Sequence, residues 1–232
     1  HLCKRLIDDG KEVLCLDNYY TGRKDNIFHL IANNNFELIR HDISLPINLE
    51  VDEIYNLACP ASPPHYQHDP IQTTKNNILA NVLILNLCVK FKIKKFIFAS
   101  TIYVHSSQGS FYKVSKQSSE LFIEEYYKKF GLNYSIIRFG SVFGPRASKK
   151  NGLSKIIHKA LVEKKIFYSG TKKAVRKFIY VKDAARGGVE VLKKKYNNKN
   201  LLLTGNSSTK ITDVLKKISL ILKIKKKPTF SN

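Results

Sequence analysis

The stretch "KKFIFAST" at residues 94–101, with "SFYKVSKQ" at residues 110–117 close behind it, decides the fold class. The first stretch is a short apolar run rich in Phe and Ile, which predicts a strand buried on both faces. The second opens a longer segment, 113–130, that has the length and apolar spacing of a helix. A buried strand followed by a helix is the unit from which parallel sheets are built.

The same alternation runs along the whole chain and predicts an α/β protein with a doubly wound parallel sheet. One helix has a clear start, because Asp69 can cap it and Pro70 suits its first position. In such a fold the first strand and a Gly-rich loop hold a dinucleotide pyrophosphate, whereas this chain opens on a helix, so we expect a fragment without both. Strands are predicted over 12–17, 36–42, 53–59, 94–101 and 134–140, and helices over 2–9, 24–33, 70–91, 113–130, 153–164, 182–195 and 211–223.

Composition narrows the class of protein further. The 232 residues are 43% hydrophobic, enough for a sizeable core, and no apolar run is long enough to span a membrane. The four cysteines lack C-x-x-C spacing and suit small buried hydrophobes in a reducing compartment, so we expect a cytoplasmic protein. The formal charge of +22 falls entirely in residues 111–232. It can reflect a solvated surface, steering of an anionic ligand, or nucleic-acid binding, and the scatter of the lysines favours the first.

A Tyr-x-x-x-Lys spacing is the core of a known type of active site. Residue frequencies alone produce about two matches, and the chain contains three. Those at 20–24 and 168–172 cross Gly-containing turns, whereas Tyr112–Lys116 opens a predicted helix after a strand that ends at Thr101. A tyrosine with a pKa of about 10 is a poor base near neutrality, and a lysine one helical turn away would stabilise its phenolate. The sequence therefore favours Tyr112–Lys116 as the catalytic pair.

Two carboxylates close predicted strands. Asp17 ends "VLCLD", where it can accept hydrogen bonds from adenosine ribose hydroxyls, and an acid there disfavours the 2′-phosphate of NADP. Its alternative role is to cap the following turn. Asp42 ends "LIRHD" and could meet the adenine.

His65 and His68 lie three residues apart without further ligands, so we expect no metal site.

Several stretches resemble extended short-chain dehydrogenases/reductases of the NAD-dependent epimerase/dehydratase family. "VLCLDNYYTGRKDNI", "FELIRHDIS" and "FASTIYV" resemble its NAD-binding half, and "NLACPASPPHYQHDP" is most similar to the UDP-glucuronate decarboxylases. Downstream, "YKVSK", "IIRFGSVFGPR" and "VRKFIYVKDAA" resemble nucleotide-sugar epimerases at least as much. The resemblance implies a Rossmann-type NAD-binding domain over 1–140 and a mainly nucleotide-sugar-binding region over 141–232. It also implies a UDP-sugar substrate and a homodimer, with neither membrane nor nucleic acid as a partner.

The resemblance also implies roles for single residues. Thr101, Tyr112 and Lys116 would be catalytic. Arg146 and Arg176 would hold the nucleotide diphosphate, whose oxygens suit the fork of a guanidinium. The residues that would bind NAD are Asp17, Asn18, Tyr20, Thr21, Gly22, Asp42, Ile43, Leu57, Ala58, Lys75, Tyr112 and Lys116.

The first choice of reaction is decarboxylation of UDP-glucuronate to UDP-xylose through a 4-keto sugar. The segment between Thr101 and Tyr112 is shorter than is usual in extended members, and Tyr103 stands where the decarboxylases carry a catalytic Glu. A nucleotide-sugar 4-epimerase or 4,6-dehydratase is therefore the alternative. A truncated relic that only binds a nucleotide is a third possibility.

Overall fold

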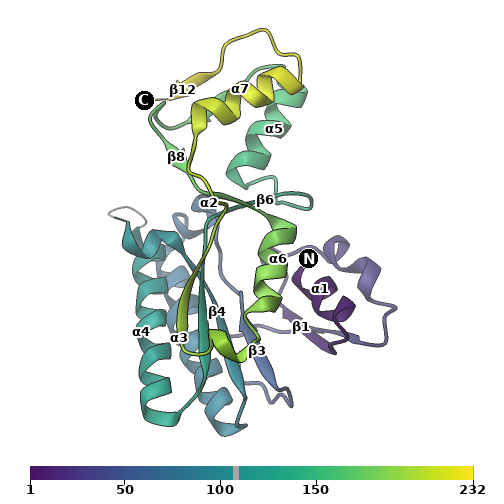
Figure 1. Ribbon diagram of the computed structural model, residues 1–232, viewed down its shortest axis with the longest axis vertical. Helices are drawn as coiled ribbons and strands as arrows, with labels where there is room; N and C mark the ends of the chain where they lie inside the picture. Colours follow the sequence, from purple (N-terminus) through teal and green to yellow (C-terminus); the bar gives the residue numbers. More distant parts are fainter. Residues whose placement is uncertain (107–109, 232) are drawn as a thin grey trace. The chain divides into compact units, whose positions relative to one another are not determined.

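The computed structural model describes residues 1–106 and 110–231 of the chain, which divides into two compact units (Figure 1). The first unit comprises His1–Phe139 and Lys182–Leu203, and the second comprises Gly140–Val181 and Thr204–Asn232. Within the described residues, no helix is both long enough and apolar enough to cross a membrane.

The first unit is built on parallel strands. Four of them form one sheet in the order β10-β5-β4-β3, and two others form a separate parallel pair, β1-β2. The strands are β1 (Val13–Asp17), β2 (Phe36–Arg40), β3 (Glu53–Asn56), β4 (Lys95–Thr101), β5 (Tyr134–Phe139) and β10 (Lys199–Leu203). The helices are α1 (Leu2–Asp8), α2 (Pro63–Tyr66), α3 (Pro70–Lys90), α4 (Ser110–Phe130) and α6 (Val181–Glu190), with 3-10 turns η1 (Lys24–Asn26), η2 (Phe28–Leu30), η3 (Ile102–His105) and η4 (Lys194–Tyr196).

The four-stranded sheet is buried on both faces, as the sequence predicts. Phe96 and Phe98 of β4 point to one face, where they pack with residues of α3 and α4 such as Leu85 and Ile123. Ile97 lies between them in the strand and points to the opposite face. Burying one such side chain contributes about 2 kcal/mol to stability.

The opposite face of the sheet is covered by α6 and the segment that follows it (Figure 1). One hydrogen bond from the sheet holds α6, and another holds the segment after it. The Tyr55 hydroxyl donates to the carbonyl of Gly188 in α6 at 2.9 Å, and the Lys95 ammonium donates to the carbonyl of Val191, just after α6, at 2.5 Å. With helices on both faces of a parallel sheet, the predicted doubly wound α/β architecture is confirmed.

Most predicted elements are present, within a few residues of their expected ends. Asp69 caps α3 as predicted, because its carboxylate accepts a 2.8 Å hydrogen bond from the Gln72 amide. The predicted helix over 24–33 is wrong, since η1 and η2 are separate 3-10 turns. Phe28 is 75% exposed there, and Leu30 is the one buried residue of the two turns. A short helix with so little apolar surface to bury gains too little to form.

In its described residues, the second unit combines two helices with six short strands. The helices α5 (Gly152–Glu163) and α7 (Ile211–Ile221) supply a core that includes Ile156, Ala160 and Leu215. None of the short strands was predicted from the sequence. They pair as β6 (Ser141–Phe143) with β9 (Phe178–Tyr180), β8 (Val175–Arg176) with β11 (Thr209–Lys210), and β7 (Phe167–Ser169) with β12 (Thr229–Ser231).

Candidate active site

Thr101, Tyr112 and Lys116 lie together in the first unit. Thr101 is the last residue of β4, and Tyr112 lies in the first turn of α4. The side chains of the two residues are hydrogen-bonded. The Thr101 oxygen also accepts from the Tyr103 amide at 3.2 Å. All three side chains are buried, with Tyr112 the most exposed at 9%. Residues 107–109, which belong to the short segment ahead of Tyr112, lie outside the described part of the chain.

The Lys116 ammonium occupies a tight site beneath the start of α4. It donates to the Ala99 carbonyl at 2.9 Å and lies 4.5 Å from the centre of the Phe98 ring. The Cys59 thiol hydrogen-bonds the same ammonium. Burial lowers the pKa of Lys116, and the neighbouring Cys59 and Glu120 oppose that shift. The lysine is therefore held in one place at the cost of its hydration.

The pKa of Tyr112 is raised, which is opposite to the direction expected from the sequence. Burial is the main cause, and Cys59, Tyr66 and Tyr103 act in the same direction. The hydrogen bond to Thr101 lowers the pKa but is outweighed. A phenolate needs solvation or a nearby cation, so burial favours the neutral phenol.

Tyr66 and Cys59 are neighbours of this cluster that the sequence did not single out. The Tyr66 ring, at the end of α2, stacks on the Tyr112 ring with centroids 4.9 Å apart and planes 14° from parallel. Both residues fall in "NLACPASPPHYQHDP", the stretch that resembles the decarboxylases. The resemblance drew attention to this stretch but assigned no role to either side chain. The folded loop brings that stretch onto Tyr112.

A buried carboxylate lies one helical turn beyond Lys116. Glu120 is 4% exposed and accepts from the Ser100 hydroxyl. It also forms a two-pronged ion pair with Arg138 of β5, with nitrogen–oxygen distances of 3.0 Å and 2.5 Å. Arg138 contacts a ring nitrogen of His105 at 2.7 Å. This network ties the ends of β4 and β5 to α4, and so to the two catalytic candidates on that helix.

The predicted adenosine-binding carboxylates lie at the carboxyl ends of β1 and β2. Asp17 accepts from the Tyr19 amide at 2.7 Å. The Asn18 amide group donates to Asp42 at 2.9 Å, so the loops after the two strands are joined. Hydrogen bonds from the Ser44 hydroxyl and amide, and from Asn18, lower the pKa of Asp42. Asp42 is thus an anionic acceptor at neutral pH.

The backbone of Gly22, which has no side chain, packs against the Asp17 carboxylate. A Cβ atom at position 22 would lie 2.9 Å from one Asp17 oxygen and 3.0 Å from the other, closer than real contacts allow. This close approach fits a site for the adenosine ribose of NAD, because in open α/β sheets ligands bind beyond the carboxyl ends of the strands.

The other residues expected around NAD are placed as follows. Thr21 and Ile43 lie in the loops after β1 and β2, and Leu57 and Ala58 follow β3. Tyr20 in the β1 loop is 61% exposed, and its ring meets that of His65 edge-on at 6.1 Å. Lys75 is exposed on the second turn of α3. These residues thus surround the ends of β1, β2 and β3, except Lys75, which α3 carries.

The two arginines expected to hold a diphosphate belong to the second unit. Arg146 follows β6 in a left-handed backbone conformation with a φ of 64°, an arrangement that costs a non-glycine residue about 1 kcal/mol. Arg176 of β8 donates to the Tyr168 hydroxyl at 3.3 Å and to the Val175 carbonyl at 3.1 Å.

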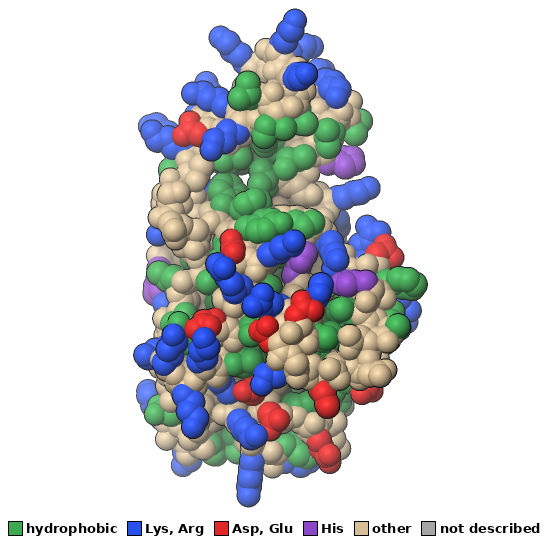
Figure 2. All heavy atoms as spheres, turned by 45° about the vertical axis from the view of Figure 1, so that its right-hand side comes forward, with side chains coloured by type: hydrophobic (Ala, Val, Ile, Leu, Met, Phe, Trp, Pro, Cys, Tyr) green, Lys and Arg blue, Asp and Glu red, His purple; other side chains and the backbone are tan. Residues whose placement is uncertain are grey.

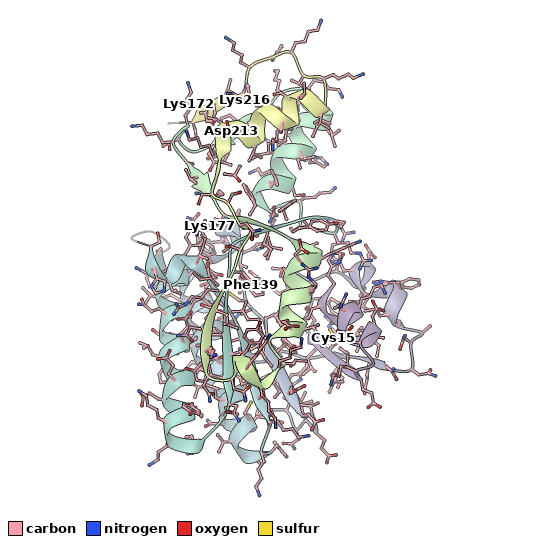
Figure 3. The ribbon with its side chains drawn as sticks, in the orientation of Figure 1. Cys15, Phe139, Lys172, Lys177, Asp213 and Lys216 are labelled. Atoms are coloured by element: carbon pink, nitrogen blue, oxygen red, sulfur yellow. The ribbon has the colours of Figure 1, made fainter. Side chains whose placement is uncertain are left out.

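The second unit carries a dense positive charge. It contains 18 Lys and Arg residues against two Asp and Glu residues, and Figure 2 shows blue side chains around its surface. Lys172, Lys177 and Lys216 are among them, with Asp213 as one of the two acids (Figure 3). Such a surface raises the local concentration of anionic ligands.

Comparison with known proteins extends the resemblance read from the sequence. A model of the NAD dependent epimerase/dehydratase family matches residues 1–202. The chain is 34% identical over 212 residues to UDP-glucuronic acid decarboxylase 1 of Arabidopsis thaliana, covering 83% of this chain and 48% of that protein. It is 35% identical over 212 residues to UDP-glucuronic acid decarboxylase 1 of Xenopus tropicalis, with 83% and 50% covered. The chain thus spans about half the length of these curated relatives.

Solved structures agree on the fold. UDP-glucuronic acid 4-epimerase from Bacillus cereus, in complex with UDP-glucuronic acid and NAD, has a TM-score of 0.89 at 26% identity over 99% of this chain and 81% of that one. dTDP-glucose 4,6-dehydratase from Bacillus anthracis str. Ames, in complex with NAD, has a TM-score of 0.88 at 21% identity, covering 99% and 79%. The predicted Rossmann-type fold is confirmed.

Proposed function

The chain belongs to the NAD-dependent epimerase/dehydratase family, and on that premise we propose that it forms part of an enzyme that binds NAD and modifies a UDP-sugar through a 4-keto intermediate. The observation that carries the proposal is the buried cluster of Thr101, Tyr112 and Lys116 at the end of β4 and the start of α4. Removing the proton of a sugar hydroxyl needs a base, here the phenolate of Tyr112, with a hydroxyl to orient the sugar oxygen and an ammonium to stabilise the phenolate.

Each side chain has a separate task in this proposal. Bound NAD would accept the hydride from C4 of the sugar and later return it. Tyr112 in its deprotonated form takes the hydroxyl proton, and Thr101, which is hydrogen-bonded to Tyr112, orients the same sugar oxygen. Lys116 stabilises the Tyr112 phenolate before the proton arrives. Burial of all three excludes water, which strengthens each electrostatic interaction in the transition state.

The cofactor and substrate would be held by the residues at the strand ends and by the basic second unit. Asp17, Asn18 and Asp42 offer acceptors and a donor to the adenosine part of NAD. We assign Arg146 and Arg176 to the diphosphate of the UDP-sugar, because guanidinium groups bind phosphate oxygens in pairs. The density of positive charge in the second unit supports a doubly anionic substrate.

Decarboxylation of UDP-glucuronate is the favoured reaction because the curated relatives named above are UDP-glucuronic acid decarboxylases. One observation favours a 4-epimerase instead. Tyr103, at the position where the sequence resemblance expects a catalytic Glu, lies close enough to Tyr112 to raise its pKa. A phenol at that position cannot supply the carboxylate that the resemblance assigns to decarboxylation.

Product analysis distinguishes these reactions. The chain is incubated with NAD and UDP-glucuronate, the nucleotide sugars are separated by chromatography, and their masses are measured by mass spectrometry. UDP-xylose, lighter by one CO2, supports the decarboxylase. UDP-galacturonate, of unchanged mass, supports the epimerase. Unchanged UDP-glucuronate with measurable NAD binding by calorimetry contradicts both and leaves a nucleotide-binding relic.

The resemblance implies a homodimer, and we further propose that it forms through α3 and α4. The two helices pack side by side, yet they expose several large apolar side chains. Leu79 is 59% and Leu83 is 43% exposed on successive turns of α3, while Val114 and Leu121 are 57% and 60% exposed two turns apart on α4. Large apolar side chains exposed on two neighbouring helices favour an interaction surface there.

Placing a charge on both helices is expected to give a monomer. The double variant Leu79→Glu/Leu121→Glu buries two carboxylates in the proposed interface, which should weaken dimerisation more than a hundredfold. Light scattering after size exclusion measures the mass. Leu220→Glu in α7, where the leucine is 81% exposed, is the matched control and should leave the mass unchanged. A monomeric unsubstituted chain would disprove the interface.

A further inference from the structure

Two side chains of α4 hold consecutive residues at the end of β4. Lys116 and Glu120 are four residues apart, so they lie on the same face of the helix. The Lys116 ammonium donates to the Ala99 carbonyl at 2.9 Å, and the Glu120 carboxylate accepts from the Ser100 hydroxyl. Thr101 is the next residue and ends the strand. The position of Thr101 therefore depends on how α4 is held against β4.

Arg138 of β5 fixes the Glu120 carboxylate. Two of its nitrogens, Nε and Nη2, donate to Glu120 at 3.0 Å and 2.5 Å. Arg138 is the partner of Ser100 in the parallel pairing of β4 with β5, so its side chain starts beside the residue that Glu120 binds. Ser100 and Glu120 are each 4% exposed, and water competes little for these bonds. Glu120 thus joins α4 to neighbouring positions of both strands.

Arg138 also holds the segment that follows Thr101. Its Nη1 atom lies 2.7 Å from the Nε2 atom of His105. Because a guanidinium can only donate, this nitrogen of His105 accepts the hydrogen bond. His105 ends η3, the 3-10 turn that begins directly after Thr101. The Glu120–Arg138 pair is therefore bonded to the chain on both sides of Thr101, at Ser100 before it and at His105 after it.

We propose that Glu120 and Arg138 are positioning residues for the reaction, because they hold the chain on both sides of Thr101 and keep α4 in register with β4. This inference rests on the proposed function, in which Thr101, Tyr112 and Lys116 act on one sugar hydroxyl. Glu120 lies eight residues after Tyr112, about 12 Å along the helix axis. Its effect on the phenol is therefore exerted through the positions of α4 and β4, and a displacement of about 1 Å can lower a rate a hundredfold.

The double variant Glu120→Leu/Arg138→Leu separates positioning from stability. It removes both charges of the buried pair together, so the chain should remain folded. The expected result is a turnover of UDP-glucuronate with NAD about a hundredfold lower, with the KM for UDP-glucuronate within threefold, because no residue assigned to substrate or NAD is changed. If the pair had only a structural role, turnover would recover together with the midpoint of urea denaturation, and that result would overturn the proposal.

Ser100→Ala removes one link and leaves the ion pair in place. Burial lowers the pKa of Lys116 and the Glu120 charge opposes that shift, so a variant that keeps this charge tests position alone. Turnover should fall about tenfold, the effect expected from one buried hydrogen bond. Ser135→Ala is the matched control, because Ser135 is fully buried near the start of β5 and donates to the Tyr196 carbonyl at 2.7 Å. It should keep turnover within twofold, and equal turnover in the two serine variants would contradict the proposal.

Fluorine NMR tests the positioning without NAD or sugar, so its failure can be told apart from failure of the proposed function. The chain is labelled with 3-fluorotyrosine, and the Tyr112 resonance is identified by its absence from Tyr112→Phe. This resonance should move by more than its linewidth in Glu120→Leu/Arg138→Leu and stay in place in Ser135→Ala. An unmoved resonance would refute the positioning even in an active chain. A moved resonance in a chain that turns over nothing would support the positioning of Tyr112 and refute only the proposed function.

Discussion

Replacing Tyr112 by Phe is expected to lower the turnover of UDP-glucuronate about a thousandfold. General bases contribute factors of roughly a hundred to ten thousand, and the phenylalanine variant lacks only the hydroxyl that accepts the proton. The aromatic ring that stacks on Tyr66 remains, while the hydrogen bond with the Thr101 hydroxyl is removed. The stability of the fold should therefore change little, while the rate of NAD reduction by substrate in a single turnover falls.

Tyr168→Phe is the matched control for this experiment, because Tyr168 belongs to another Tyr-x-x-x-Lys match in the chain. Its hydroxyl accepts from Arg176 within the second unit, whereas Thr101, Tyr112 and Lys116 all belong to the first unit. It should retain turnover within a few-fold of the unsubstituted chain. If Tyr112→Phe kept more than a tenth of the activity, Tyr112 would not be the base.

Replacing Glu120 by Ala is expected to lower the free energy of unfolding by about 3 kcal/mol. The carboxylate is buried between Ser100 and Arg138, and removing one member of a buried ion pair leaves the other charge without its partner. The loss should be at the lower end of the range for buried pairs, since the Arg138 side chain is 15% exposed and keeps some water. Urea denaturation followed by circular dichroism measures the change.

The exposed pair of Glu125 and Lys128 on the same helix is the control. Both side chains are about two-thirds exposed, so Glu125→Ala should cost less than about 1 kcal/mol. The double variant Glu120→Leu/Arg138→Leu should recover most of the loss, because it removes both charges together. Equal losses for Glu120→Ala and Glu125→Ala would show that burial of the pair contributes nothing.

The parts of the fold that the sequence predicts are those dominated by local pattern and burial. The run that contains Phe96 and Phe98 reads as a strand because its four residues 96–99 are all apolar, which is typical of a strand in a sheet covered on both faces. The start of α3 is readable because Asp69 and Pro70 act within one helical turn. In both cases the interactions that form the element lie close together in the chain.

The missed features depend on contacts between distant segments. β10 escapes prediction because it is a short edge strand, with Leu202 64% exposed, and pairing with β5 alone defines it. Tyr66 becomes a neighbour of Tyr112 only when α2 folds over the start of α4. The direction of the pKa of Tyr112 was missed for a related reason, since burial is a property of the whole unit and not of Lys116 one turn away.

The packing of Gly22 against Asp17 has a consequence for how the chain can vary. While Asp17 keeps its carboxylate, a side chain at position 22 would collide with it, so position 22 can change only after position 17 has changed. A shorter residue at position 17 would free position 22, but it would also remove the acceptor at the end of β1. Gly22 is therefore a packing requirement of Asp17, and its presence adds no information about the ribose site beyond that given by Asp17.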